Sequence, residues 1–143
     1  MTDYYDDVRE FHEKNGVPHH PDERPHLLSA DEQEFRVKFL REELDEFADA
    51  HAQGRLADAA DALVDLAVVC LGTAHMMGVP FGECWDAVHA ANMTKVRATG
   101  DDDPRSKRGS GLDIVKPAGF RPPDHRPALE AARLAWLQLQ VKE

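Results

Sequence analysis

Residues 56–77, with the sequence LADAADALVDLAVVCLGTAHMM, decide the fold. Apolar residues occur on nearly every side of a helix drawn through this segment, and a helix of that kind is normally buried. Its only carboxylates, Asp58, Asp61 and Asp65, lie along one stripe. Asp58 has a simple alternative role, since a negative charge near a helix N-terminus offsets the helix dipole. Asp61 and Asp65 are expected to point inward, where buried carboxylates need a partner.

Helical periodicity also dominates the rest of the chain. It predicts a helix over residues 3–14, a long helix opened by a capping box of Ser29 and Glu32 and ending at Gly54, a helix over 82–97, and a last helix from Pro127 onward. The Pro- and Gly-rich residues 99–123 predict a lid-like loop, with a possible strand only around LDIV. We therefore expect an all-α fold. It would be a four- to five-helix bundle in one domain, residues 1–143, with a C-terminal helix over 126–143.

Composition narrows the classes of function. The chain has 143 residues and a formal net charge of −10, which argues against a protein that binds nucleic acid through its phosphates. Cys70 and Cys84 form no CxxC pair and are expected to be ordinary thiols. The first residues lack the apolar core of a signal peptide, and no apolar run is long enough to span a membrane. We expect a cytoplasmic protein without a membrane partner.

A second acidic stretch, REELDEF at residues 41–47, lies on the preceding predicted helix. At about 100° per residue, Leu44 and Phe47 fall within one apolar wedge that is expected to be buried. Glu43 borders that wedge, and Glu46 lies on its shoulder. Alone, these glutamates fit an acidic solvated face equally well. Beside the aspartate stripe, however, a divalent cation held by carboxylate oxygens would satisfy both sets of acids.

The ligand type indicates which metal and which substrate this site would take. Oxygen ligands without supporting Cys or regularly spaced His favour Mg²⁺ or Mn²⁺ over zinc. Magnesium held by carboxylates keeps positions open for water and for substrate phosphates. An acidic protein can bind a polyanion in this way.

Several stretches in order resemble a known family. They are VREFHEKNG, REELDEF, DAADALVDLAVVCLGTAHMMGVP, VHAANMTKV and KPAGFRPPD. Together they resemble the all-α nucleoside triphosphate pyrophosphohydrolases, the MazG-like and phosphoribosyl-ATP pyrophosphohydrolase-like group, over roughly residues 8–125. EExxE alone is common on surface helices, whereas the ordered set is specific. The resemblance implies a helical bundle that assembles as a homodimer or homotetramer.

The resemblance also implies roles for individual residues. Glu42 and Glu43 would be catalytic, and two or three Mg²⁺ or Mn²⁺ ions would be held by Glu42, Glu43, Glu46, Asp61 and Asp65. The family has Glu where this chain has Ala62, and Asp61 stands one residue earlier, about 100° around the helix. Asp61 is therefore either a replacement ligand or a neighbour of the ligands. The matching substrate-binding positions are Phe11, His12, Asn15, Lys38, Asn92, Lys95, Lys116 and Phe120.

Some of these positions have ordinary alternatives. Phe11 and His12 could be core residues, and Asn92 with Lys95 could be an exposed turn. The reaction implied is hydrolysis of a (deoxy)nucleoside triphosphate, (d)NTP, to (d)NMP and pyrophosphate. We lean to dGTP or GTP, as in the phage MazZ-type branch, with a dUTP-directed housecleaning pyrophosphatase as the alternative. A non-catalytic acidic helical interaction module also stays open, and divalent metal would not stabilise it.

Overall fold

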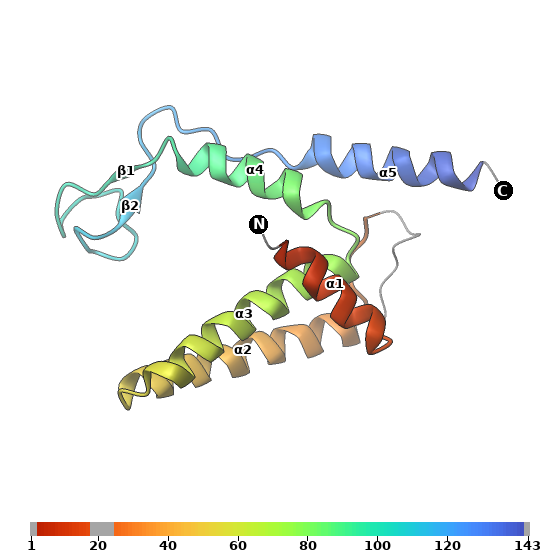
Figure 1. The fold of residues 1–143 in the computed structure, drawn as a ribbon. Coiled ribbons are helices and arrows are strands. Elements are labelled where there is room, and N and C mark those ends of the chain that lie inside the picture. The colour runs from red at the N-terminus through yellow and green to blue at the C-terminus, as the bar shows by residue number, and fades with distance from the viewer. Residues whose placement is uncertain (1–2, 18–24, 142–143) are drawn as a thin grey trace. The chain divides into compact units, whose positions relative to one another are not determined.

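The computed structural model describes residues 3–17 and 25–141 (Figure 1). Within these ranges the helices are α1 (Tyr4–Lys14), α2 (Ala30–Ala52), α3 (Leu56–Met76), α4 (Phe81–Asn92) and α5 (Arg126–Gln140). The strands β1 (Val96–Arg97) and β2 (Ile114–Val115) lie between α4 and α5. The predicted all-α class is confirmed. Residues 18–24 of the link after α1 and residues 142–143 of the predicted last helix lie outside the described residues.

The chain forms two compact units. The first contains the residues up to Phe81 together with those from Leu129 onward, and the second is Gly82–Ala128. We describe each unit by itself. None of the described helices combines the length and the hydropathy that crossing a membrane requires.

The centre of the first unit is the hairpin of α2 and α3, which lie side by side in Figure 1. The predicted capping box opens α2: the Ser29 backbone amide donates to Glu32 Oε2 at 3.0 Å, and the Glu32 amide donates to Ser29 Oγ at 3.3 Å. After α2 the chain turns at Gly54, whose φ of 69° is in the left-handed region that favours glycine. This short turn makes the two helices antiparallel neighbours.

The side of α2 that packs against α3 differs from the expected apolar wedge. The buried residues of α2 are Arg36, Glu43 and Ala50, spaced by seven along one face. Leu44, expected to be buried, is 53% exposed. The facing side of α3 includes the small buried residues Ala59 and Ala62, which let the α2 backbone approach closely. Glu43, at the edge of the predicted apolar face, is therefore buried, and the apolar side chain of Leu44 lies on the surface of the single chain.

The first helix covers one end of this hairpin. His12 on α1 is 2% exposed, and its ring lies 5.5 Å from the His75 ring on α3. A Cβ at Gly72 would be only 2.6 Å from His12 Nε2, so glycine is what lets α1 pack here. Elsewhere α3 stays open, with Leu63 and Val64 exposed. The expectation that this helix is buried on every side is wrong for the single chain, because α1 and α2 cover only part of it.

The second unit differs from the sequence prediction at its start. The helix predicted to reach residue 97 ends at Asn92, because Val96 and Arg97 pair in antiparallel register with Val115 and Ile114. The strand suspected in LDIV is thus present, as two residues. Two buried carboxylates, Asp103 and Asp113, tie the loop together through side-chain and backbone hydrogen bonds.

Candidate functional site

Glu43 is the most unusual carboxylate of the first unit. It is only 7% exposed, whereas the neighbouring glutamates Glu42 and Glu46 on the same helix are exposed. Its Oε2 is shielded from solvent and has no hydrogen-bond partner among the described residues. A buried carboxylate oxygen without a partner is costly unless a ligand satisfies it. Glu43 is therefore a candidate ligand for a cation.

Other carboxylates surround Glu43. Burial raises the pKa of Glu43 above its ordinary value of 4.5, and the negative charges of Glu46, Asp65, Glu42 and Asp61 raise it further. Two of these acids come from α2 and two from α3. The fold thus brings the acidic stretch REELDEF and the aspartate stripe of α3 to one place. The electrostatic repulsion among them is relieved by adding positive charge.

An acidic hollow of about 310 Å³, which Glu43 itself does not line, lies between the two helices toward the turn at Gly54. Glu46, Asp49, Ala50, Arg55, Asp58 and Asp61 line it. Asp58 forms an ion pair with Arg55, which supports the simpler of its two interpretations, a structural role near the helix N-terminus. Asp61 shares the hollow with Glu46, whereas Ala62, at the position where the family has Glu, is buried against its neighbours.

The donor set suits a hard divalent cation. All five carboxylates around the site offer oxygen atoms, the ligand type that Mg²⁺ prefers, and the buried Glu43 Oε2 has no hydrogen-bond partner among the described residues. In the described part of the chain, no three His, Cys, Asp or Glu side chains converge closely enough to hold an ion as they stand. Glu42, Glu46 and Asp61 are exposed, so rotation of their side chains is sterically open.

Arg36, seven residues before Glu43, fixes the position of α2 along α3. Arg36 Nη2 donates to the Val69 carbonyl oxygen at 2.8 Å, and Arg36 Nε donates to Thr73 Oγ1 at 3.0 Å. Arg36 and Glu43 share one face of α2, seven residues apart, and Val69 and Asp65 are one turn apart on α3. Burial lowers the pKa of Arg36. The arginine contacts therefore set which aspartates face Glu43.

A second hollow lies at the other edge of the glutamates. Phe35, Lys38, Phe39 and Glu42 line a space of about 250 Å³. The Phe35 and Phe39 rings are 6.1 Å apart, and the Arg36 guanidinium lies 5.6 Å from the centre of the Phe39 ring. Sequence reasoning named Lys38 but missed both phenylalanines. Their spacing of four residues, directly before the EExxE motif, was the available signal.

The three candidates on α1 lie in different settings. His12 is in the core against α3, as described above. Phe11 is exposed, and its carbonyl oxygen accepts a hydrogen bond of 2.7 Å from Asn15 Nδ2. Asn15 is thus engaged in capping the end of α1. The structure does not bring these three side chains together on one surface.

In the second unit the candidates converge on one ring. The Lys95 Nζ lies 5.9 Å and the Lys116 Nζ 5.2 Å from the centre of the Phe120 ring. Asn92 is the last residue of α4, and its carbonyl oxygen accepts a hydrogen bond from the Lys95 amide at 3.0 Å. The predicted phosphate-binding lysines therefore lie around one aromatic side chain.

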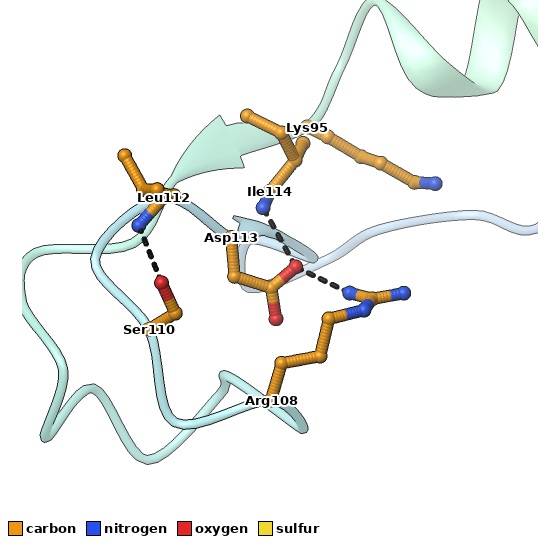
Figure 2. Close-up of a pocket in the computed structure, with 6 residues that line it drawn as sticks. All are labelled: Lys95, Arg108, Ser110, Leu112, Asp113 and Ile114. Atoms are coloured by element: carbon orange, nitrogen blue, oxygen red, sulfur yellow. Dashed lines mark hydrogen bonds and ion pairs between the residues drawn. The ribbon is translucent and has the colours of Figure 1, made fainter. Parts of the chain in front are cut away.

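The structure adds Arg108, which sequence reasoning did not single out. It lines a pocket with Lys95, Ser110 and Asp113, shown in Figure 2. Its guanidinium forms an ion pair with Asp113. The basic run around it, RSKR, gave no indication of which cation would be held in place.

Comparison with known proteins agrees with the resemblance in the sequence. Residues 8–92, more than half of the chain, match a family model described as phosphoribosyl-ATP pyrophosphohydrolase. No individual curated protein matches the sequence. The matched region runs from α1 to the end of α4, so it contains every carboxylate of the site but stops before Lys95, Lys116 and Phe120.

Proposed function

The chain belongs to the phosphoribosyl-ATP pyrophosphohydrolase family, and from that membership we propose that it is a metal-dependent (d)NTP pyrophosphohydrolase. The family fixes the general class, hydrolysis of a nucleotide with release of pyrophosphate. The finer proposal is that the substrate is a (deoxy)nucleoside triphosphate, with dGTP or GTP favoured. The observation that carries the metal-dependent reaction is Glu43, a buried carboxylate with an oxygen that has no partner among the described residues and four other carboxylates acting on it.

We propose Mg²⁺ or Mn²⁺ as the cofactor, two or three ions per site. Glu43, Glu46 and Asp65 would hold the metal, with Glu42 and Asp61 as further ligands. When bound, divalent cations neutralise charge on phosphate oxygens and make water more acidic. The position of Asp61 in the same hollow as Glu46 supports its use in place of the family's glutamate, which Ala62 has replaced.

The protein residues would then direct the reaction. Water attacks the α-phosphorus, the bond from that phosphorus to the bridging oxygen breaks, and pyrophosphate leaves. We assign the proton of the attacking water to Glu42, because it is exposed beside Glu43 and also lines the hollow with Lys38. A positioned carboxylate that accepts a proton contributes about 10²–10⁴-fold to a rate.

The hollow of Phe35 and Phe39 is our candidate for the nucleobase. It lies beside Glu42, and its two rings offer faces on which a base can stack. Such stacking accepts any base, so Lys38 would provide a polar contact that selects one. A lysine donor suits the oxygen and nitrogen acceptors of guanine, which supports the lean to dGTP or GTP.

We propose that Lys95 and Lys116 bind phosphates of the substrate. Both ammonium groups lie near the Phe120 ring, and a phosphate group at this ring would bring negative charge to both of them. Asn92, at the end of α4, would donate to the same phosphates.

We further propose a homodimer or homotetramer. Leu44 on α2 and Leu63 and Val64 on α3 are exposed in the single chain, and so are Leu134 and Leu139 on α5. Exposed apolar side chains on helices, two of which carry the acidic site, suit a subunit interface.

The decisive experiment measures pyrophosphate and monophosphate release. The full chain is offered the common ribo- and deoxyribonucleoside triphosphates, dUTP and phosphoribosyl-ATP, with Mg²⁺, with Mn²⁺ and with a chelator. We expect metal-dependent release of pyrophosphate with the matching monophosphate, fastest with dGTP or GTP. A preference for dUTP would instead identify a housecleaning enzyme. No release from any substrate by the folded protein, and no thermal stabilisation by Mg²⁺, would favour the non-catalytic interaction module.

A further inference from the structure

We propose that Arg108 is a further phosphate-binding residue, held by Asp113 so that its guanidinium and the Lys95 ammonium bind one phosphate or pyrophosphate group. This inference rests on the proposed function, because it names an additional anion contact of the same substrate or product. It concerns the second unit alone. The argument starts from the residue that holds the arginine.

Asp113 is fixed in place by its surroundings. It is 8% exposed, its Oδ1 accepts a hydrogen bond of 2.9 Å from the Ile114 amide, and its Oδ2 accepts one of 2.9 Å from Ser106 Oγ. Its own carbonyl oxygen accepts a hydrogen bond of 2.8 Å from the Ala98 amide, next to the β1–β2 pair. The hydrogen bond from Ser106 and the charge of Arg108 lower the pKa of Asp113, so the carboxylate stays charged.

Arg108 is held by this carboxylate yet remains open to solvent. Its Nη1 contacts Asp113 Oδ1, while the arginine side chain is 75% exposed. Figure 2 shows the other end of the guanidinium directed away from Asp113. A guanidinium has five N–H donors in a rigid plane that matches phosphate geometry. The ion pair therefore orients the group and leaves donors for a ligand.

Lys95 supplies the second positive charge. It lines the same pocket, of about 430 Å³, and Figure 2 shows its side chain extending to the same side as the Arg108 guanidinium. Among the described residues, no carboxylate forms an ion pair with Lys95. The chain between Lys95 and Arg121 carries more basic than acidic residues, although the whole protein has a net charge of −10. Two cations at one pocket in an acidic protein favour an anionic ligand.

The chemistry of the pocket points to phosphate. Ser110 and the backbone of the loop add polar groups at its wall, and Leu112 and Ile114 add an apolar side. Charge-assisted and bidentate contacts from arginine are the strong mode of phosphate binding. Arg108 would thus act with Lys95 on the leaving pyrophosphate or on the phosphates of the nucleotide.

The test is calorimetric titration of the full chain with inorganic pyrophosphate. Variants Arg108→Ala, Arg108→Lys and Lys107→Ala are compared with the wild type. Lys107 is the matched control, because it is an exposed cation next to Arg108 that does not line the pocket. We expect Arg108→Ala to weaken binding about tenfold or more, Arg108→Lys to weaken it less, and Lys107→Ala to change it by less than about twofold. In nucleotide hydrolysis, Arg108→Ala should raise KM.

The outcomes separate this inference from the proposed function. Unchanged pyrophosphate affinity in Arg108→Ala, or an equal loss in Lys107→Ala, would overturn the inference while leaving measured nucleotide hydrolysis intact. Pyrophosphate binding that needs Arg108, in a protein that hydrolyses no nucleotide, would support the anion site and overturn the proposed function.

Discussion

Arg36 on α2 donates a hydrogen bond of 2.8 Å to the backbone carbonyl oxygen of Val69 on α3. This contact joins the two helices seven residues from Glu43, and Thr73 accepts a second hydrogen bond from the same side chain. Because the contact is to the backbone, it holds α3 in position along α2 whatever side chain stands at position 69. The acidic cluster depends on this register, since Glu43 faces Asp61 and Asp65 only if the helices do not slide.

Replacing Arg36 tests the register directly. We expect Arg36→Ala to lower the free energy of unfolding by about 2–4 kcal/mol, because it removes buried packing and leaves buried acceptors without their charged donor. Arg41→Ala, on an exposed position of the same helix, should change it by less than about 0.5 kcal/mol. Urea unfolding measures both. Equal effects of the two substitutions would contradict the structural role of Arg36.

The pKa of Glu43 predicts an unusual pH dependence of stability. Because the folded-state pKa is raised above 4.5, protonation of Glu43 stabilises the metal-free fold. That stability is fully present below pH 4.5 and is lost as the pH rises through the raised value. Glu43→Gln lacks this loss, so at neutral pH and without metal the variant should be more stable than the wild type.

Comparing the two proteins at each pH isolates Glu43 and its coupling to the four neighbouring carboxylates, because contributions from more distant groups are shared. Added Mg²⁺ should stabilise the wild type and leave Glu43→Gln nearly unchanged, and the variant should lose at least about 100-fold in hydrolysis. Thermal unfolding with and without a chelator gives the first measurement. A variant that is less stable than the metal-free wild type at neutral pH would show that Glu43 has a partner we have not identified.

Substitutions of the three aspartates of α3 should differ in their effect on the rate of hydrolysis. Asp65→Asn and Asp61→Asn should reduce metal-dependent hydrolysis, by at least about tenfold for Asp65, because both carboxylates lie near Glu43 and are proposed to bind the metal with it. Asp58→Asn should change the rate by less than about threefold, since its carboxylate pairs with exposed Arg55. Initial rates at several Mg²⁺ concentrations provide the comparison. If Asp61→Asn behaved like Asp58→Asn, Asp61 would be a neighbour of the ligands rather than one of them.

Gly72 should not tolerate a methyl group. A Cβ there would lie 2.6 Å from His12 Nε2 and 3.0 Å from Arg36 Nη2, and both side chains are buried. Alanine adds about 1 kcal/mol of helix propensity, but overpacking costs about 1–3 kcal/mol, so a net loss of stability is expected. Gly82→Ala on α4 meets nothing within 4 Å and should instead stabilise. Denaturant unfolding of the two variants should therefore give shifts of opposite sign.

Leu44 should report on subunit assembly. In the single chain it is 53% exposed, so Leu44→Lys should change the stability of an isolated subunit by less than about 1 kcal/mol. If α2 contributes to an interface, the same change buries a charge there and should shift the protein toward a smaller species in analytical ultracentrifugation. Leu27→Lys, also at an exposed leucine, is the control. If the wild-type protein sedimented as a monomer, the proposed homodimer or homotetramer would be wrong.

The sequence by itself determined the local structure. The Ser29–Glu32 capping box, the turn at Gly54 and the helix ends near residues 14 and 77 depend on neighbours in the chain, and each lies within a residue of its predicted place. The motifs that resemble the family depend on order along the chain, and the match over residues 8–92 confirms the family. The helix predicted to reach residue 97 failed because β1 pairs with β2, a contact between residues almost twenty positions apart.

Only the tertiary structure decided which face of each helix is buried. A helical wheel ranks faces by hydrophobicity, but α2 turns Arg36 and Glu43 toward α3 and leaves Leu44 exposed, because contacts with the α3 backbone and its small residues require that rotation. The same holds for Arg108, which is one basic residue among several in the sequence. Its distinction comes from Asp113, whose position is set by the strand pairing and by Ser106. Local propensities act between near neighbours, whereas these choices arise from contacts across the fold.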